Sequence, residues 1–506
     1  MKLIRALPIL ASVAAQAQTA EHPNIVFVFP DQMRNAALGL WSEPEYASYV
    51  GWQGDPTHTP RLNQFARESV VLSHVQSCCP LSSPYRGMML TGMYPDGSGI
   101  TLNCNSTRPL SSLREDARCI SDVLTGSGYE CAYIGKLHAD FPTPNDPEHA
   151  GQYVDPRDPH WDAYTPEERR HGFSYWYSYG TYDVHNAPHY WDTEGHFHQV
   201  QDYSPRHEVD RALDFLAQRD TLRPFLLMMS MNPPHSPYET TNDCTEQDLR
   251  LYADKPIDSL LVRRNINYEL TNKLPSAPYY FANVTGVDRE FGRLLDALDS
   301  LHLSQNTIVV FTSDHGETMC SHVWDPKNSP YDESMNVPFI IRYPDKLRPR
   351  VDNLLLTSPD IMPTLLGLAG LQDSIPGSVQ GSNLARQLAG SRKDRPQGVL
   401  YIRNMDGTKD ADGIVQDYFA ESRGIRTDRY TLVFSLKRDG SLKKTWLFDN
   451  KRDPYQNTNL PISDHQRLVR RLCQQMLPLL QQADDPWIRQ HTFQKLMNSL
   501  HINIQY

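Results

Sequence analysis

The chain has 506 residues, 39% of them hydrophobic and 22% charged, so it can bury a sizeable core and is not disordered over any long stretch. Its 49 basic and 60 acidic side chains give a net charge of −11. That balance argues against non-specific binding to nucleic acid or to an anionic membrane surface. The length predicts one large domain with a smaller companion, or two to three domains.

Residues 1–17 have the pattern of a signal peptide. Lys2 and Arg5 form a charged start, Leu7 to Ala15 is a short apolar run, and Ala15-Gln16-Ala17 fits cleavage after Ala17. A disordered N-terminus is the alternative. No later stretch approaches the roughly 20 apolar residues of a membrane span, and the first cysteine, Cys78, lies too far along for a lipid anchor. We therefore expect a periplasmic or secreted protein without a membrane span.

Apolar runs of strand length alternate with helical patterns over the first 340 residues. Continuous apolar runs suit buried strands of a parallel sheet, and strands that alternate with helices predict an α/β domain. We expect a central, mostly parallel sheet flanked by helices. The predicted strands are 24–29, 132–134, 225–231, 307–312 and 338–341, and the predicted helices are 116–127, 207–219 and 282–301.

The remaining segments differ in composition and hydrophobic periodicity. Residues 140–206 are rich in Tyr, Trp, His, Pro and Asp without clear periodicity, which predicts a functional loop or a lid. Residues 351–388 have a helical and peripheral pattern. After Arg395 short alternating strands are predicted at 399–402, 422–434 and 445–448, and an amphipathic helix at 465–480. We expect a main domain over 22–390 and a smaller α+β subdomain over 395–506, made of an antiparallel sheet and a helix.

Two segments place metal-ligand side chains directly after predicted strands. They are Asp31-Gln32 and the segment that begins with Asp314-His315. Because the carboxyl ends of parallel strands lie at one edge of a sheet, these groups can meet there. A set of mostly oxygen ligands suits Ca²⁺ or Mg²⁺, and the imidazole of His315 leaves room for Mn²⁺ or Zn²⁺. The alternative is that each aspartate only caps the following helix.

The segment Ser82 to Gly92 reads Ser-Ser-Pro-Tyr-Arg-Gly-Met-Met-Leu-Thr-Gly. It resembles the signature of the type I, formylglycine-dependent sulfatases of the alkaline phosphatase superfamily, in which Cys or Ser is followed by Pro and Arg at alternate positions and then by Leu-Thr-Gly. Three later elements resemble the same family and follow in its order. They are Gly135-Lys136-Leu137-His138, Pro233-Pro234-His235-Ser236-Pro237, and Lys327 ahead of Tyr331 to Ser334. The resemblance covers about residues 22 to 370.

The position of the nucleophile is the informative departure from the commoner form of this family. It holds Ser82 instead of Cys, and a shifted register that starts at Cys78 lacks the required arginine. By resemblance, serine-type sulfatases are converted to formylglycine by an oxygen-independent maturating enzyme, which implies an anaerobic bacterial source. Gln32 stands where many relatives have Asp, and His315 where many have Asn. Gln32 removes one negative charge from the metal site and so should weaken metal binding somewhat.

The resemblance implies a role for each matched residue. Hydrated formylglycine at position 82 attacks the sulfur of a sulfate monoester, while Arg86 and Lys136 hold this nucleophile in its reactive state. A metal ion, most simply Ca²⁺, activates it and neutralises a sulfate oxygen. Lys327 takes charge on the sulfate oxygens. We expect His235 to be the general acid and His138 the general base, with the reverse assignment as the alternative. The expected metal ligands are Asp31, Gln32, Asp314 and His315.

The expected substrate is an O-sulfated carbohydrate from a host or dietary glycan, because an exported anaerobic sulfatase is usually a glycan scavenger. Lys136, His235 and Lys327 should contact the sulfate group. The segment 179–191 has the aromatic and polar mixture that binds sugars, and a plain structural loop explains it equally well; its candidate residues are Asp183, His185, His189, Tyr190 and Trp191. Arg403, Arg423 and Arg426 are further candidates for the rim of the pocket.

Two other functions remain open from the sequence. One is a phosphatase, phosphodiesterase or phosphonate hydrolase of the same superfamily, although those enzymes lack the signature at 82–92. The other is an inactive, glycan-binding homologue in which Ser82 is never modified. The eight cysteines show neither a disulfide framework nor zinc-ligand spacing, and leave room for one or two disulfides.

Overall fold

The computed structural model describes residues 22–105, 111–140, 162, 164–322, 327–404 and 420–504. The predicted signal peptide, residues 1–17, lies outside this range. Over the described residues no helix has both the length and the apolar character needed to cross a membrane. All eight cysteines are buried thiols.

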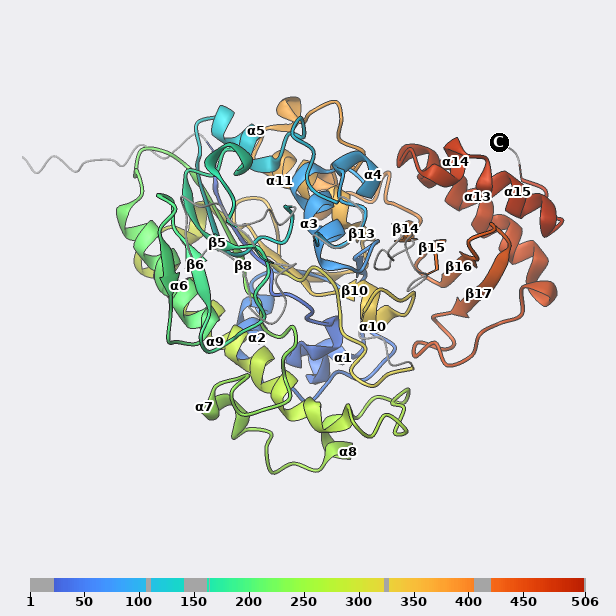
Figure 1. Ribbon diagram of the computed structural model, residues 1–506, viewed down its shortest axis with the longest axis horizontal. Coiled ribbons are helices and arrows are strands. Elements are labelled where there is room, and N and C mark those ends of the chain that lie inside the picture. The colour runs from blue at the N-terminus through green and yellow to red at the C-terminus, as the bar shows by residue number, and fades with distance from the viewer. Residues whose placement is uncertain are drawn as a thin grey trace, which may run out of the picture.

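A ten-stranded sheet runs through the middle of the molecule (Figure 1). Its central strands are parallel: β1 pairs in parallel with β8 and β9, and β4 pairs in parallel with β8 and β5. In order across the sheet the strands are β12 (Arg350–Asp352), β2 (Val70–Leu72), β11 (Phe339–Arg342), β9 (Thr307–Thr312), β1 (Asn24–Val28), β8 (Phe225–Ser230), β4 (Glu130–Lys136), β5 (Tyr175–Tyr179), β6 (His189–Trp191) and β7 (Phe197–Gln199).

Helices cover both faces of this sheet, so alternate residues of its strands enter two separate cores. Val26 and Val28 of β1 face the core beneath α2 (Pro60–Arg67), α6 (Ser204–Gln218) and α9 (Ala277–Ser300). Ile25 and Phe27 face the core beneath α3 (Ser82–Thr91), α5 (Ile120–Gly126) and α11 (Ile361–Leu368). The predicted α/β class with a mostly parallel central sheet is confirmed.

The C-terminal part has its own antiparallel sheet, which lies at the right in Figure 1. Its strands are β14 (Val399–Arg403), β15 (Ser422–Arg426), β16 (Tyr430–Leu436) and β17 (Leu442–Asp449), and α13 (Gln466–Gln482) packs on it. The apolar cluster of this part also contains Cys78, Cys79 and Met88, which flank or belong to the start of α3. The expected antiparallel sheet with a helix is therefore present, whereas the boundary at 390–395 stays a prediction.

The shorter elements complete the fold. A small sheet joins β10 (Asn336–Val337), β3 (Val75–Gln76) and β13 (Leu356–Thr357). The remaining helices are α1 (Pro44–Ala47), α4 (Pro95–Ser98), α7 (Glu246–Leu249), α8 (Ile257–Leu260), α10 (Asp332–Met335), α12 (Ala385–Leu388), α14 (Pro486–Arg489) and α15 (Thr492–Ser499).

Three sequence-based expectations were wrong in detail. In the described part of 140–206, β5, β6 and β7 extend the central sheet, because short aromatic strands can pack without simple alternation. The segment 351–388 is not peripheral, since Ile361, Met362 and Leu365 of α11 are buried in a core. The single strand predicted at 422–434 is two antiparallel strands, β15 and β16, joined by a turn at 427–429.

A fully buried ion pair stabilises the loop that follows β1. The guanidinium of Arg34 donates to both carboxylate oxygens of Asp55, at 2.7 and 2.8 Å, and to the carbonyl oxygen of Thr318 at 3.0 Å. Both charged side chains are 0% exposed. Arg34 therefore ties the loop after β1 to the loop after β9.

Replacing Asp55 by Ala should lower the free energy of unfolding by about 3–5 kcal/mol, because it leaves the buried guanidinium of Arg34 without its counter-charge. Denaturant unfolding followed by circular dichroism measures this loss. The matched control is Asp116→Ala, which breaks the exposed Arg114–Asp116 pair and should leave the midpoint unchanged. Equal small effects of the two substitutions would contradict the argument.

Candidate active site

The predicted site residues converge at the carboxyl edge of the central sheet. Asp31 follows β1, Asp314 follows β9, and Lys136 ends β4. The backbone N–H of Gln32 donates to Asp314 Oδ1 at 3.0 Å, and His315 Nε2 lies 3.4 Å from Asp31 Oδ1. The structure thus brings together two segments that are separated by more than half of the chain.

Asp31, Asp314 and His315 form a compact group of potential metal ligands. All three are fully buried, and one ligand atom of each lies within 4.8 Å of the others. His315 Nδ1 lies 3.0 Å from the carbonyl oxygen of Gly316, so this nitrogen carries the hydrogen and Nε2 faces the carboxylates. Burial lowers the pKa of His315 to about 4 although both carboxylates oppose that shift. Its imidazole is therefore neutral, as a metal ligand must be.

The side-chain amide of Gln32 has an oxygen that is unpaired among the described residues and that a metal ion would satisfy. Its Nε2 donates to Glu317 Oε2, which also accepts from the hydroxyl of Tyr238 at 2.9 Å. Its Oε1 is buried and has no hydrogen-bond partner within the described part of the chain. An unsatisfied buried carbonyl oxygen is costly, and a hard cation would satisfy it. Together with Asp31, Asp314 and His315, the amide makes a ligand set that fits Ca²⁺, Mg²⁺ or Mn²⁺.

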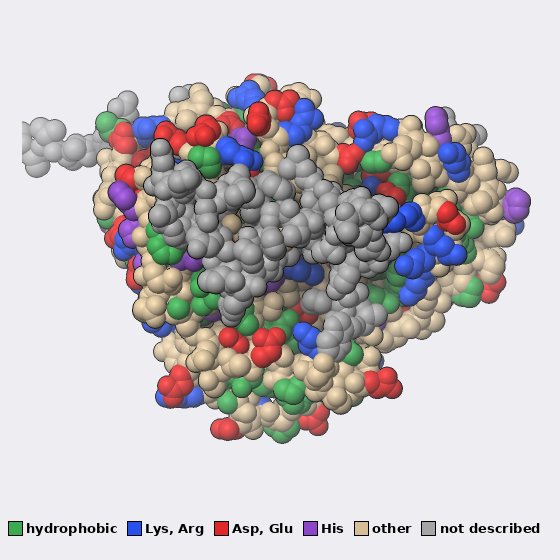
Figure 2. Space-filling model, viewed as in Figure 1, with side chains coloured by type: hydrophobic (Ala, Val, Ile, Leu, Met, Phe, Trp, Pro, Cys, Tyr) green, Lys and Arg blue, Asp and Glu red, His purple; other side chains and the backbone are tan. Residues whose placement is uncertain are grey.

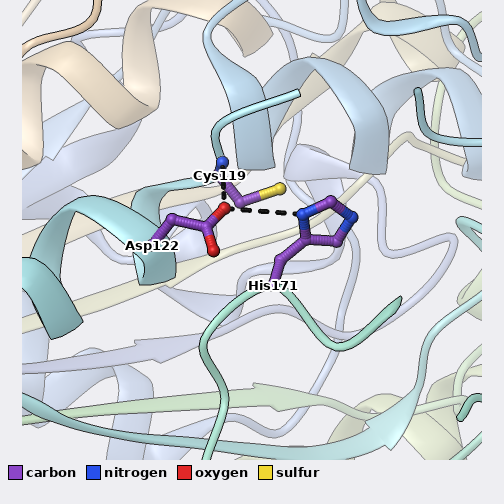
Figure 3. Close-up of side chains that lie close together, drawn as sticks. All are labelled: Cys119, Asp122 and His171. Atoms are coloured by element: carbon purple, nitrogen blue, oxygen red, sulfur yellow. Dashed lines mark hydrogen bonds and ion pairs between the residues drawn. The ribbon is translucent and has the colours of Figure 1, made fainter. Parts of the chain in front are cut away.

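A second group of possible ligands shares no residue with the first and has another explanation. Figure 3 shows Cys119, Asp122 and His171 side by side. Asp122 Oδ2 accepts a 2.8 Å hydrogen bond from the backbone N–H of Cys119 and lies 3.4 Å from His171 Nδ1. The carboxylate therefore already serves to cap α5. This group needs no metal to account for it.

Ser82 lies directly on the metal-ligand group. It is the first residue of α3 and only 1% exposed. Its Oγ lies 3.0 Å from His315 Nε2 and 3.3 Å from Asp31 Oδ2. A nucleophile formed at this position would therefore sit beside the ion.

Arg86, one turn further along α3, connects four strand ends. Its Nη1 donates to the carbonyl oxygen of Lys136 at 2.7 Å and to Ser230 Oγ at 2.6 Å. Its Nη2 donates to Asp31 Oδ2 at 3.1 Å and to Asp314 Oδ2 at 3.4 Å. Burial would lower the pKa of Arg86, but Asp314 and Asp31 outweigh burial and raise it. The guanidinium is therefore a permanent positive charge beneath Ser82.

Lys136 and His138 come from the end of β4. Lys136 Nζ lies 2.9 Å from Asp31 Oδ2, 3.0 Å from Asn232 Oδ1 and 3.5 Å from Asp183 Oδ1. The preceding Gly135 has φ +97°, and a Cβ there would come within 2.2 Å of a carbonyl oxygen of β8. Burial lowers the pKa of His138 well below its usual value, and the nearby cations Lys136 and Arg86 lower it further. His138 is therefore neutral.

His235 and Lys327 face each other across the site. Lys327 Nζ lies 3.0 Å from His235 Nε2 and 3.4 Å from His315 Nε2. His235 Nδ1 is 2.8 Å from the carbonyl oxygen of Ser236, so Nδ1 donates and Nε2 accepts from the ammonium group. Burial lowers the pKa of His235 to about 3, and Lys327 and Lys136 act in the same direction. A general acid at His235 thus requires the negative charge of a bound substrate.

The C-terminal sheet holds the segment that carries Lys327. The carbonyl oxygen of Asn328 accepts from the hydroxyl of Tyr401 at 3.2 Å and from Arg403 Nη1 at 3.3 Å, and its N–H donates to Pro80 at 3.0 Å. Arg426 forms two hydrogen bonds with the carboxylate of Asp332, at 3.0 and 2.9 Å. These arginines therefore position the Lys327 segment.

The other residues predicted to bind sugar lie in buried contacts. His189 Nε2 is 2.6 Å from Asp162 Oδ2, and its ring packs on Tyr182 and Trp191. His185 is 1% exposed, and its Nδ1 donates to the carbonyl oxygen of Asp243 at 2.7 Å. Arg423 is buried against Asp485 at 2.6 Å. For these three residues a role in sugar binding stays a prediction.

Two polar residues that contact the site were missed from the sequence. Ser230 binds Arg86, and Asn232 binds Lys136. Both lie at the end of β8, between two strands whose terminal residues had been identified. Their position directly after a predicted central strand is the signal that could have found them.

Comparisons with known proteins identify the family of this chain. A family model described as Sulfatase matches residues 23–371, and one described as N-sulphoglucosamine sulphohydrolase, C-terminal, matches residues 320–482. An endo-4-O-sulfatase of Bacteroides thetaiotaomicron is 58% identical over 479 residues, which cover 93% of this chain and 94% of that protein. A ulvan-active sulfatase of Formosa agariphila is 33% identical over 457 residues, which cover 87% of this chain and 77% of that protein.

The fold is also similar to a solved structure from work on the metabolism of multiple glycosaminoglycans by Bacteroides thetaiotaomicron, a 4S-sulfatase. The TM-score is 0.90 at 57% identity, and the match covers 94% of this chain and 99% of that one. The sulfatase family model alone spans more than half of the sequence. The chain therefore belongs to the type I sulfatases of the alkaline phosphatase superfamily, which hydrolyse sulfate esters.

Proposed function

We propose that this enzyme is an exported carbohydrate sulfatase that removes 4-O-sulfate from within glycosaminoglycan chains. The 58% identity to an endo-4-O-sulfatase over 93% of the chain supports the position of the sulfate and attack within the chain. The similar structure from work on glycosaminoglycan metabolism supports the substrate class. The convergence of Arg86, Lys136 and Lys327 around Ser82 supports the chemistry, because two buried cations and a partly buried one can bind an anionic group.

The chain's own residues would bind the sulfate and move protons around it. Formylglycine at position 82, once hydrated, supplies an oxygen nucleophile and returns to the aldehyde after sulfate leaves. Arg86 and Lys136 hold that oxygen, and Lys327 stabilises the sulfate oxygens. His235 Nε2 protonates the departing sugar oxygen after the bound sulfate has raised its proton affinity, and His138 takes the proton of the remaining hydroxyl.

A divalent cation would be held by Asp31, Gln32, Asp314 and His315. When bound, it supplies positive charge that lowers the pKa of the nucleophilic oxygen and neutralises one sulfate oxygen. Ca²⁺ is our first choice because three of the four ligands offer oxygen.

A glycosaminoglycan polymer needs cationic surface beyond the reaction centre. Figure 2 shows Lys and Arg side chains on the C-terminal part of the visible face. The turn after β16 and the start of β17 expose Lys437, Arg438, Lys443 and Lys444 although the whole chain is acidic. Such a cluster supports binding of a long anionic chain.

The two alternative functions have less support. A pure glycan-binding protein has no use for the buried acid–base pair His138 and His235 beside the cations Lys136 and Lys327. A phosphoester or phosphonate hydrolase is disfavoured by the sulfatase family match over residues 23–371.

Conversion of Ser82 is the first point to measure. In protein made with a serine-type maturating enzyme, the tryptic peptide that contains Ser82 should be lighter by two hydrogen atoms in mass spectrometry. Protein made without that enzyme should carry the unmodified serine and be nearly inactive. Unmodified serine in every preparation, with no activity on any sulfate ester, would contradict the proposed activity and favour an inactive, glycan-binding homologue.

Metal binding gives a second expected result with a readout that is independent of activity. After treatment with a chelator, Ca²⁺ should raise the melting temperature of the protein in a saturable way. Gln32→Met, which removes the unpaired oxygen at similar volume, should weaken this binding by about tenfold or more. His171→Ala, in the group of Figure 3, is the matched control and should bind as the wild type does. Loss of the effect in the control alone would place the ion elsewhere.

Activity on an intact polymer tests the substrate. Modified enzyme incubated with chondroitin 4-sulfate should release sulfate that ion chromatography detects, without prior cleavage of the chain by a lyase. Disaccharide analysis should then show loss of the 4-sulfated units. Ser82→Ala serves as the control. Release only from short oligosaccharides would contradict endo action.

A further inference from the structure

Asp183 is a carboxylate that faces the cationic centre without being needed to neutralise it. Its Oδ1 lies 3.5 Å from Lys136 Nζ and 3.5 Å from His235 Nδ1. These distances are too long for strong hydrogen bonds, and Oδ1 has no hydrogen-bond partner among the residues with a described position.

Both neighbours of Asp183, the cation Lys136 and the imidazole of His235, already have closer partners. Lys136 Nζ is satisfied by Asp31 at 2.9 Å and by Asn232 at 3.0 Å. His235 Nδ1 donates to the carbonyl oxygen of Ser236 at 2.8 Å. The side chain of Asp183 is also 37% exposed, whereas those of Lys136 and His235 are 1% and 12% exposed. Asp183 is therefore the residue of this group whose side chain is most accessible to a bound substrate.

The segment around Asp183 is held in place by its neighbours. The carbonyl oxygen of Tyr182 accepts from Asn232 Nδ2 at 3.5 Å and from the N–H of Val184 at 3.0 Å. His185 donates to the carbonyl oxygen of Asp243, and Asn186 Nδ2 donates to that of Asn242 at 2.6 Å. A carboxylate on an anchored segment can orient a substrate group without a large cost in conformational entropy.

A carboxylate is the wrong charge for a sulfate oxygen, so it must serve another part of the substrate. Sugar hydroxyl groups are the hydrogen-bond donors that a sulfated carbohydrate carries, and a carboxylate is acceptor only. We propose that Asp183 accepts a hydrogen bond from the free hydroxyl nearest the scissile sulfate and thereby selects sugars in which that hydroxyl is not itself sulfated. This inference rests on the proposed function and adds the recognition of the sugar to it.

The negative charge of Asp183 determines which sugars are disfavoured. A second sulfate at this place would bring like charge onto Asp183 and leave the carboxylate without a donor, and both effects disfavour binding. In chondroitin the 3-oxygen of the 4-sulfated hexosamine carries the glycosidic bond, so its 6-hydroxyl is the nearest free donor. Chondroitin 4-sulfate should therefore be accepted and chondroitin 4,6-disulfate discriminated against.

The test compares sulfate release from these two polymers at concentrations below saturation, with formylglycine content verified for each protein. The wild type should prefer the 4-sulfate by about tenfold or more. Asp183→Asn, which keeps the shape and removes the charge, should bring the ratio of the two rates close to one. Asp183→Ala should also lower the rate on the 4-sulfate by about tenfold to a hundredfold. Asp192→Asn, a charge-matched control that pairs with His198 at 2.7 Å, should keep the wild-type ratio.

Each outcome decides a separate point. A wild-type preference that Asp183→Asn abolishes supports the inference. The comparison of the two polymers in the wild type does not depend on whether any variant folds. Equal rates for both polymers in the wild type overturn the inference and leave the sulfatase function intact. A lower rate in Asp183→Asn with an unchanged ratio shows that Asp183 acts only on Lys136 and His235, and overturns it as well. No release from either polymer by the wild type overturns the proposed function and the inference together.

Discussion

The reaction centre depends on one buried guanidinium. Arg86 lies within 3.4 Å of carboxylates at the ends of β1 and β9, and it also binds the end of β4 and Ser230 of β8. Without this positive charge, Asp31 and Asp314 would repel each other in a fully buried position. The signature sequence places Arg86 four residues after Ser82. One turn of α3 therefore holds the guanidinium of Arg86 at a fixed position relative to the side chain of Ser82.

Around that interaction the enzyme balances charges at short range. Asp31 contacts Arg86 and Lys136. Burial would raise its pKa, but the cations Lys136 and Lys327 outweigh burial, so that its pKa lies well below the usual value. The histidines of the site are neutral because burial lowers their pKa values, and the nearby cations lower the pKa values of His138 and His235 further. The site is thus prepared for an anionic ligand, whose arrival changes the proton affinity of every group that it touches.

The sequence indicated most of this site because its chemistry is local. A strand end followed by Asp, or an Arg four residues after a Ser, can be recognised without knowing the fold, and the α/β class followed from alternating apolar runs. Asp183 lay in a segment predicted to bind sugar, and Ser230 and Asn232 lay at a predicted strand end. Which groups these three residues contact depends on how neighbouring strands end relative to one another, and the sequence does not show that. The short aromatic strands β5 to β7 were missed because they lack a regular pattern, and the turn at 427–429 was hidden between two apolar strands.

The depth of Ser82 has a consequence for the order of events in the cell. In the folded enzyme this residue is 1% exposed, at the buried start of a helix, so a second protein could not reach its side chain. Its oxidation would have to take place on the nascent or unfolded chain. If formylglycine forms at Ser82 as we propose, folding becomes the step that encloses the modified residue, and a polypeptide that folds before conversion would remain a stable but inactive molecule. The speed of folding would in this way limit how much active enzyme is made.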